Sequence, residues 1–534
     1  MGRKNDSKMC LFTNQNISWN SENYTCEMFD ILNEYNKDSL IKTLENAKHY
    51  IEGIFKVRPI ENYNFSLIGY DSVFDDPPES YSSNCDLHIT VVSRPFESYS
   101  TVAMAAILQR NNKDFRPIQG ALIINPRMVP SIPQNESSTE NYFFKSLIHE
   151  IFHIFGFSAS NYKYFHSLND FDPYSNVFCN LTSKGKNFTF LITPYAHKYA
   201  KKHFKTNYFM GDNNTRCLSG IELEDGGKSG TAMSHLEMRT YLTDIMAPHI
   251  SYLEGEFNVF SDASMAVLLD TGNYKIDFKK VKPMLWGNID LHKNEVFNAS
   301  SFAIGPPQLV FPDLYLASSQ NDKIGFDYTF YSRDLSIDES ELDEESKEKY
   351  IKGKNFYNPK NFKNIGSNDV IDFSNIKSPS FICNHGLAAI NGIENCVLYE
   401  IINNSKIRFS WDNYSLVCNE SMSNTIHKIG NYEIVCPVFE RFIRAKALHN
   451  SFFSSDPFDG DDFKYSDPYF ANNDQKTVFN SKEKLIILGI VLSIVFICFI
   501  VSVILIFIFY QINMHNKRVP QRNNVESDNS FVNL

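Results

Sequence analysis

Apolar residues recur at helical spacing in two stretches of the N-terminal third of the chain, and they alternate in a stretch between them. Within residues 38–57 the apolar positions lie three or four residues apart, which predicts an amphipathic helix. These positions are Leu40, Leu44, Ala47, Ile51 and Phe55. Residues 87–92 alternate as a half-buried strand does, and residues 142–148 return to helical spacing. A capping box at 137–140 and a glycine at Gly156 are typical ends of such a helix.

A different pattern near the C-terminus is a long apolar run without any charge. Residues 485–510 would span about 39 Å as a helix, more than the roughly 30 Å of a bilayer core. Lys517, Arg518 and Arg522 follow the run, which by the positive-inside rule places the tail in the cytoplasm. The sequence therefore predicts a single-pass type I membrane protein whose main part is extracellular or lumenal.

The glycosylation sequons agree with this orientation, because all of them precede the apolar run. They begin at Asn5, Asn16, Asn23, Asn64, Asn135, Asn180, Asn187, Asn213, Asn298, Asn403, Asn413 and Asn419. We therefore expect a glycoprotein.

Composition and charge narrow the class of protein. The chain has 534 residues, 43% hydrophobic and 14% aromatic, which is enough for two or three domains. Its net charge of -11, without a basic block, argues against nucleic acid as a partner. Acidic residues gather at 338–348, which we expect to form a solvated loop.

The second predicted helix carries the pattern of a zinc site. Residues 149–156 read His-Glu-Ile-Phe-His-Ile-Phe-Gly. On a helix, His149 and His153 project from one face and can share a tetrahedral zinc ion. Glu150 lies between them and can act as general base toward a zinc-activated water. The spacing predicts one zinc ion per chain.

Catalytic zinc sites usually have three protein ligands, so another ligand is required. The short metzincin pattern would place it at position 159, but that residue is Ala159. The third ligand must therefore come from a more distant part of the chain. Histidine candidates are His166, His197, His203, His235 and His249. Glu237 is a rival, because other enzymes with this motif use a distant glutamate.

Three later segments carry a family resemblance. Residues 220–227 read Gly-Ile-Glu-Leu-Glu-Asp-Gly-Gly, residues 234–239 read Ser-His-Leu-Glu-Met-Arg, and residues 244–248 read Asp-Ile-Met-Ala-Pro. With the zinc helix they closely resemble the leishmanolysin family of zinc metalloendopeptidases, in which an insertion precedes the third histidine. The resemblance implies that His235 is the third zinc ligand and that Met246 forms the Met-turn beneath the metal.

The Met-turn after His235 argues against Glu237 as a ligand. We expect Glu237 and Arg239 to orient the loop or to pair with each other.

The fold class implied by the resemblance is α+β, with a metzincin-like catalytic domain. The predicted parts are an N-terminal catalytic subdomain with the zinc helix (10–159), a central subdomain with the third histidine and Met-turn (160–292), a mainly β, cysteine-containing C-terminal domain (293–450), a stalk (451–484), one transmembrane helix (485–510) and a cytoplasmic tail (511–534).

Nine of the ten cysteines precede the apolar run, in a compartment that permits disulfides. Family resemblance supports a Cys10–Cys26 bond, and Cys418–Cys436 is a reasonable second pair. Because nine is odd, we expect at least one thiol to be unpaired, modified or bonded between chains, and Cys85 is the candidate. Cys10 as a zinc-blocking switch is the alternative to a disulfide. Family members normally carry a signal peptide and a propeptide, and neither is recognisable here. Either the sequence begins late, which we expect, or the C-terminal anchor itself drives membrane insertion.

The expected function is zinc-dependent hydrolysis of peptide bonds in protein or peptide substrates at a cell surface or another membrane. The apolar run at 120–125 is either an edge strand that pairs with extended substrate, as in metzincin-like enzymes, or an internal core strand. The competing hypothesis is a catalytically inactive surface protein for cell adhesion on a leishmanolysin scaffold. A protease restricted to one membrane-proximal partner is a third possibility.

Overall fold

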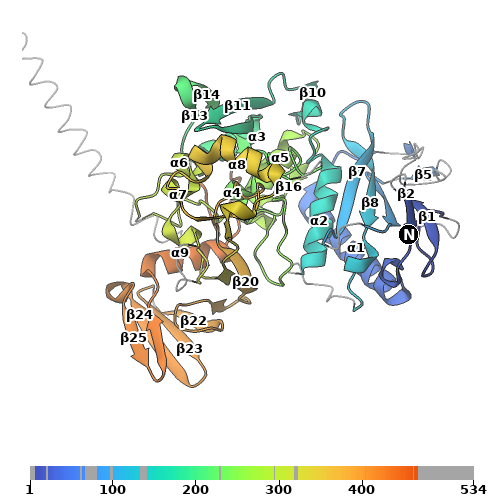
Figure 1. Ribbon diagram of the computed structural model, residues 1–534. Helices are drawn as coiled ribbons and strands as arrows, with labels where there is room; N and C mark the ends of the chain where they lie inside the picture. The colour runs from blue at the N-terminus through green and yellow to red at the C-terminus, as the bar shows by residue number, and fades with distance from the viewer. Residues whose placement is uncertain are drawn as a thin grey trace, which may run out of the picture. The chain divides into compact units, whose positions relative to one another are not determined.

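A three-stranded sheet forms the centre of the N-terminal part of the structure (Figure 1). Its strands, in spatial order, are β6 (His88–Ser93), β8 (Pro117–Ile124) and β7 (Ala103–Arg110). β6 runs parallel to β8, and β7 runs antiparallel to it. Every residue of β8 is buried, so the apolar run at 120–125 belongs to an internal strand. Its alternative role as a substrate-binding edge is wrong, because β7 is the edge strand on that side.

The computed structural model describes residues 6–19, 22–60, 63–65, 81–83, 85–96, 100–132, 141–227, 230–293, 295–317, 323–402, 404–460 and 462–466.

Two long helices pack with this sheet. They are α1 (Glu34–Ile54) and α2 (Tyr142–Phe155), the two helices predicted from apolar spacing. The Asn141 side chain accepts hydrogen bonds from the Phe143 and Phe144 amides and so caps α2, whereas the predicted capping box at 137–140 lies outside the described residues. Gly156 ends α2 with a φ of 122°, a conformation that glycine adopts without strain.

The segment from 160 to 292 consists of short hairpins and helices. Its strands are β9 (His166–Ser167) paired with β10 (Asp170–Pro173), the sheet β11 (Phe178–Ser183), β12 (Lys186–Leu191) and β15 (Ile221–Glu222), and β13 (Tyr208–Met210) paired with β14 (Arg216–Leu218). Its helices are α3 (Pro194–His203), α4 (Met238–Tyr241) and α5 (Asp262–Asp270). β16 (Lys275–Ile276) pairs with β3 (Phe55–Lys56) directly after α1, which ties this segment to the N-terminal part.

The chain after residue 293 is more helical than expected. Its helices are α6 (Ala299–Ile304), α7 (Pro307–Val310), α8 (Glu344–Tyr357) and α9 (Phe439–Asn450). A four-stranded sheet comprises β21 (Leu387–Ala388), β22 (Val397–Ile402), β23 (Lys406–Trp411) and β24 (Tyr414–Asn419). Paired strands are β17 (Phe330–Arg333) with β20 (Ser378–Ile382), β18 (Ile337–Asp338) with β19 (Asn364–Ile365), and β25 (Ile426–Ile429) with β26 (Tyr432–Val435). A mainly β description thus fits only the later part of this region.

The acidic run at 338–348 is not a loop. Asp343 caps α8 through the Ser346 amide, and Glu344 and Glu345 occupy the first turn of that helix. Carboxylates are favourable there because the helix N-terminus carries partial positive charge. The run thus comprises the end of β18, a 3-10 turn at Glu339–Glu341 and, from Glu344, the first turns of α8.

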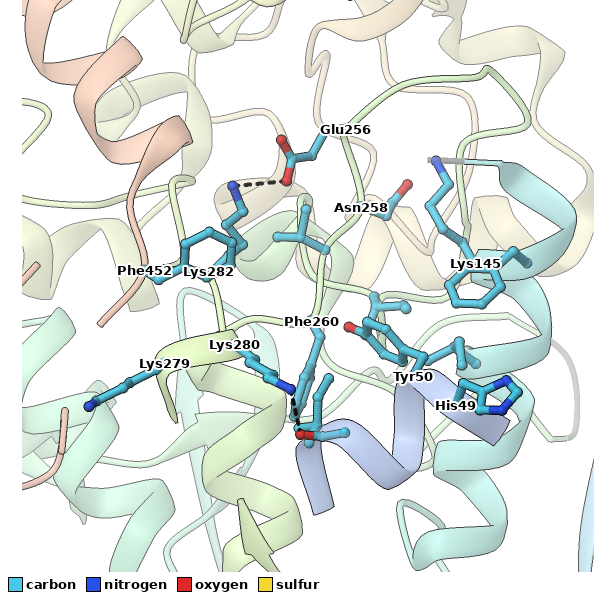
Figure 2. Close-up of a pocket in the computed structure, with 16 residues that line it drawn as sticks. His49, Tyr50, Lys145, Glu256, Asn258, Phe260, Lys279, Lys280, Lys282 and Phe452 are labelled. Carbon is cyan, nitrogen blue, oxygen red and sulfur yellow. Dashed lines mark hydrogen bonds and ion pairs between the residues drawn. The ribbon is translucent and has the colours of Figure 1, made fainter. Parts of the chain in front are cut away.

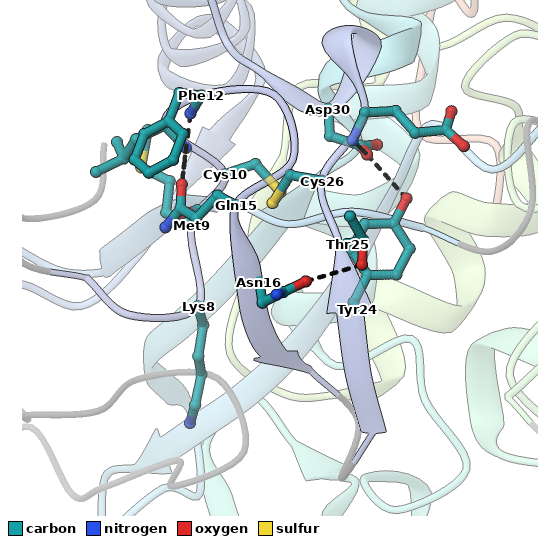
Figure 3. The surroundings of a disulfide bond; sticks show 12 residues. Lys8, Met9, Cys10, Phe12, Gln15, Asn16, Tyr24, Thr25, Cys26 and Asp30 are labelled. Carbon is teal, nitrogen blue, oxygen red and sulfur yellow. Dashed lines mark hydrogen bonds between the residues drawn. A yellow bond between two sulfur atoms is a disulfide. The ribbon is translucent and has the colours of Figure 1, made fainter.

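The cysteine predictions agree with the structure. Figure 3 shows the Cys10–Cys26 disulfide beside the hairpin of β1 (Asn16–Trp19) and β2 (Glu22–Thr25), and Cys418–Cys436 is bonded as well. Two further disulfides, Cys179–Cys217 and Cys383–Cys396, were not predicted. Cys85 is unpaired, as expected.

The remaining described strands are β4 (Tyr63–Phe65) and β5 (Tyr81–Ser83), which pair with each other. No helix among the described residues has the length and apolarity needed to cross a bilayer. The predicted span at 485–510 lies outside the described residues, as do the tail and most of the stalk.

Candidate metal centre

Three imidazoles meet at one point between α2 and the segment that precedes α4. His149 and His153 stand one turn apart on α2, and His235 comes from the loop after β15. The Nε2 atoms of His149 and His153 are 3.1 Å apart, and the His235 Nε2 lies 3.1 Å and 3.2 Å from them. The structure thus brings together the two helix histidines and one of the five distant candidates.

Backbone carbonyls fix the orientation of all three rings. The Nδ1 of His149 donates to the Ile245 carbonyl at 2.6 Å, and that of His153 donates to the Phe157 carbonyl at 2.6 Å. His235 Nδ1 contacts the Thr231 carbonyl at 2.8 Å. Since a carbonyl only accepts, each Nδ1 carries the proton and each Nε2 presents a lone pair to the common point.

Burial keeps the rings neutral. It lowers the pKa of His149 to about 3 and that of His153 to about 4, and it lowers the pKa of His235 well below the usual value. Neutral imidazole is the form that binds metals. The site is therefore ready to bind a cation at neutral pH.

The donor set fits a zinc ion. Nitrogens at 2.0–2.1 Å from a tetrahedral zinc lie about 3.3 Å apart, close to the spacing seen here. Three lone pairs aimed at one another repel unless a cation lies between them. The carbonyl partners also supply the outer hydrogen bonds that zinc-binding histidines normally make.

Glu150 lies on α2 between the two helix histidines and reaches the sheet edge. Its carboxyl accepts a hydrogen bond from the backbone N–H of Ala105 on β7. Burial raises the pKa of Glu150 to about 8, and the Ala105 hydrogen bond opposes that shift. The side chain remains partly exposed, so it can contact a ligand that enters along the edge strand.

Met246 is fully buried and is fixed directly behind the His235 segment. Its carbonyl accepts from the Leu236 amide at 3.0 Å, and its own amide donates to Asp244 Oδ1 at 2.6 Å. The Asp244 carboxylate also accepts from the hydroxyls of Ser261 and Ser264 at the start of α5. These hydrogen bonds to Asp244 fix the turn whose Ile245 carbonyl orients His149.

A cluster of buried charges fixes the other side of the His235 segment. Arg239 pairs with Glu222 on β15 and, at 2.9 Å, with Asp372. Lys186 on β12 lies 2.8 Å from Asp372 and 3.9 Å from Glu237. We call these five residues the charged cluster. Burial opposes the charge on Lys186, but the surrounding carboxylates keep its pKa well above the usual value.

Comparison with known proteins assigns the family. The sequence profile of leishmanolysin matches residues 3–293. The chain is 27% identical over 286 residues to leishmanolysin of Leishmania donovani, which covers 52% of this chain and 44% of that protein. It is 28% identical over 217 residues to the leishmanolysin-like peptidase of Drosophila melanogaster, covering 35% and 29%. The ciliated left-right organizer metallopeptidase of Danio rerio is 28% identical over 193 residues, covering 35% and 28%.

This chain belongs to the leishmanolysin family. Members of the family are zinc metalloendopeptidases. The chain spans less than half the length of the curated relatives it matches.

The other histidine candidates have different partners. His166 contacts the Asp114 carbonyl, His197 contacts the Ser219 carbonyl, and His203 contacts the Trp286 carbonyl. His249 is exposed and is not among the clustered rings. Glu237 is buried in the charged cluster rather than among the imidazoles.

A hydrogen bond connects the end of the insertion typical of the leishmanolysin family with the residues that follow α2. The Ala159 amide donates to the Ser234 hydroxyl at 3.3 Å, so the residue before His235 lies against the position where the short motif would place its third histidine. His235 therefore enters the triad from a segment that lies next to residue 159 in space, although it is far from it in sequence.

Sequence reasoning missed the backbone partners and most of the charged cluster. Glu237 and Arg239 were expected to orient the loop or to pair with each other. The ion pairs of Arg239 are with Glu222 and Asp372, so the first of these alternatives agrees with the structure. The Arg239 amide donates a hydrogen bond to Glu237 Oε1 at 3.3 Å, and the Glu237 carboxylate also contributes to the raised pKa of the Arg239 guanidinium. Asp372 lies 133 residues after Arg239 and has no motif that could have marked it.

Proposed function

We propose that this chain is a zinc-dependent endopeptidase in which His149, His153 and His235 hold the metal. The observation that supports this most directly is the convergence of three Nε2 atoms within 3.2 Å, each ring with its Nδ1 bound to a carbonyl. Family membership supports the same activity. A zinc ion in such a site supplies Lewis acidity for a carbonyl and for a water molecule.

The residues of the chain then divide the work. Glu150 accepts a proton from the attacking water and delivers it to the leaving amine. Its hydrogen bond from Ala105 orients the carboxyl at the edge of β7. Met246 provides an apolar support behind the His235 segment.

The edge strand β7 is the proposed substrate platform. Among the described strands only β8 pairs with β7, so the opposite backbone edge of β7 can accept an added strand beside Glu150. An extended peptide paired there would bring its carbonyls past Glu150. Proteins and peptides are therefore the proposed substrates.

Sequence supports a membrane anchor and glycans for the same protein. The charge-free run at 485–510 and the basic residues after it favour a single-pass type I arrangement. Of the sequon asparagines with described side chains, none is buried. Asn180 and Asn187 lie on paired strands, and each accepts a hydrogen bond from the threonine of the other's sequon, Thr189 or Thr182. These two sites form one exposed face of the β11–β12 hairpin.

The deciding experiment measures zinc content and hydrolysis of unfolded casein by the full-length chain. Glu150→Gln should retain about one zinc while kcat/KM falls by about 10²–10⁴-fold, the usual contribution of a general base. Glu345→Gln, an exposed carboxylate at the start of α8, is the matched control and should behave as wild type.

Two results would contradict the proposal. If wild type holds zinc and cleaves neither casein nor a peptide library, the hypothesis of an inactive binding or adhesion protein replaces that of an enzyme. If wild type holds no zinc, the metal assignment is wrong.

A further inference from the structure

A cavity of about 660 Å³ lies between α1, α2 and the sheet, separate from the histidine triad. Its size is within the range of small-molecule pockets. The walls are mostly apolar and include Leu44 and Ile51 of α1, Val91 of β6, Leu122 of β8, and Ile151 and Phe155 of α2. Such walls suit a hydrocarbon or an aromatic body.

One buried cation that lines this cavity has a single long ion pair and no hydrogen bonds from its guanidinium among the described residues. Arg116 is only 2% exposed, and its Nε and both terminal nitrogens have no hydrogen-bond partner among the described residues. Its ion-pair partner is Asp86, whose Oδ1 lies 3.5 Å from the guanidinium, beyond hydrogen-bond geometry, and accepts a hydrogen bond from the Ile60 amide at 2.9 Å. The Asp86 side chain is 43% exposed, so water weakens its attraction for Arg116.

A buried guanidinium without hydrogen bonds is costly, because it has lost its hydration and gained little in return. Its planar fork matches a carboxylate, which accepts two parallel N–H bonds. A ligand with a carboxylate at one end and an apolar body would therefore satisfy Arg116 and fill the apolar walls together.

A second pocket serves as a comparison, because cations line it as well. This pocket has a volume of about 370 Å³ and is lined by four lysines, which are labelled in Figure 2. Lys145 donates to the Gly255 carbonyl at 3.0 Å, Lys280 to the Gly53 carbonyl at 2.9 Å, and Lys282 pairs with Glu256 at 3.0 Å. The fourth, Lys279, is exposed. Among its described lining residues, this pocket therefore has no buried lysine without a hydrogen bond or ion pair.

We propose that the Arg116 cavity binds an amphipathic carboxylate, such as a medium-chain fatty acid, with its carboxylate on the guanidinium. The cavity lies on the side of α2 that carries Ile151 and Phe155, and the proposal does not depend on peptidase activity.

The test is calorimetric titration of the full-length chain with octanoate, with octanol as the uncharged probe of equal chain length. Wild type should bind one octanoate, and Arg116→Met, which keeps the length of the side chain but removes its charge, should bind it at least about 10-fold more weakly. Octanol should bind both proteins equally. Arg216→Met, an exposed arginine on β14, is the matched control and should leave octanoate affinity unchanged.

A second readout uses the cavity wall. Cys85 lines the same cavity and is not in a disulfide, so in a Cys498→Ser background octanoate should slow its reaction with a thiol reagent. Val91→Phe should abolish both the binding and this protection by filling the cavity. Octanoate that fails to bind wild type, or that binds Arg116→Met as tightly as wild type, would overturn the proposal.

Discussion

The histidine triad and the charged cluster are two buried polar sites joined by residues 235–239, yet they are built on opposite principles. In the triad, all three side chains are neutral, and their outer nitrogens are satisfied by carbonyls while the inner ones face one another. In the charged cluster, full charges face one another, as in the Arg239 pairs with Glu222 and Asp372. A site in which three neutral lone pairs face one another can bind an ion, whereas ion pairs between buried cations and carboxylates hold their segments together.

The largest expected effect comes from removing the third ligand of the triad. His235→Ala should lose stoichiometric zinc and lower kcat/KM by more than the roughly 100-fold that loss of an outer partner costs. Zinc content and peptide hydrolysis, measured on the same preparation, check this. His197→Ala is the matched control, because His197 lies in the same inserted region and its ring is hydrogen-bonded to Ser219 among the described residues. Equal losses in both variants would remove the distinction between the triad and an ordinary histidine.

The charged cluster should respond in stability instead. Arg239→Met leaves Glu222 and Asp372 buried without their guanidinium partner, which should lower the free energy of unfolding by about 3–5 kcal/mol. Urea denaturation of the metal-depleted protein measures it without a zinc contribution. Arg408→Met, which breaks an exposed pair with Glu400, should cost less than about 1 kcal/mol. A small effect at Arg239 would mean that the cluster does not fix this segment.

Removal of the metal should affect the melting temperature through the histidine triad and not through the charged cluster. Chelation should lower the melting temperature of wild type by several degrees, because an ion that binds only the folded state stabilises it. The melting temperature of His235→Ala should not respond to chelator, while that of Arg239→Met should start lower and still respond. Calorimetric scans with and without chelator give all three values. A response in His235→Ala equal to that of wild type would place the ion elsewhere.

The smallest effect concerns a charged pair outside both sites. Burial raises the pKa of Glu295, but hydrogen bonds from His292 and Arg441 outweigh it and lower the value from 4.5 to about 2. A depressed folded pKa stabilises the protein above pH 4.5, and this contribution is lost as pH falls from 4.5 toward 2. At neutral pH, Glu295→Gln should cost about 1 kcal/mol, since the pair is partly exposed. The difference from wild type in melting temperature should shrink over this acidic range; a constant difference would contradict the shift.

Several features could be predicted because they depend on neighbours in the sequence. The spacing of Leu40, Leu44 and Ala47 indicated α1, although the helix begins four residues before the predicted start. The Cys10–Cys26 bond spans 16 residues and followed from family resemblance. Edge and internal strands could not be distinguished in the same way, because the apolar run at 120–125 looks alike in both until β6 and β7 are seen on its two sides.

The sequence alone indicated the helix at 142–155 through its apolar spacing. It also indicated that His149, Glu150 and His153 share one side of that helix, because they lie within four residues of one another. Family resemblance added His235, which the structure places beside them. Only the tertiary structure decided that the Ile245, Phe157 and Thr231 carbonyls orient the rings, and that Asp372 meets Arg239. Backbone acceptors have no residue signature, and partners far apart in the chain meet only when the core packs. Local periodicity therefore indicated α1, α2 and β6, while tertiary packing decided which buried polar groups are paired and which can bind a ligand.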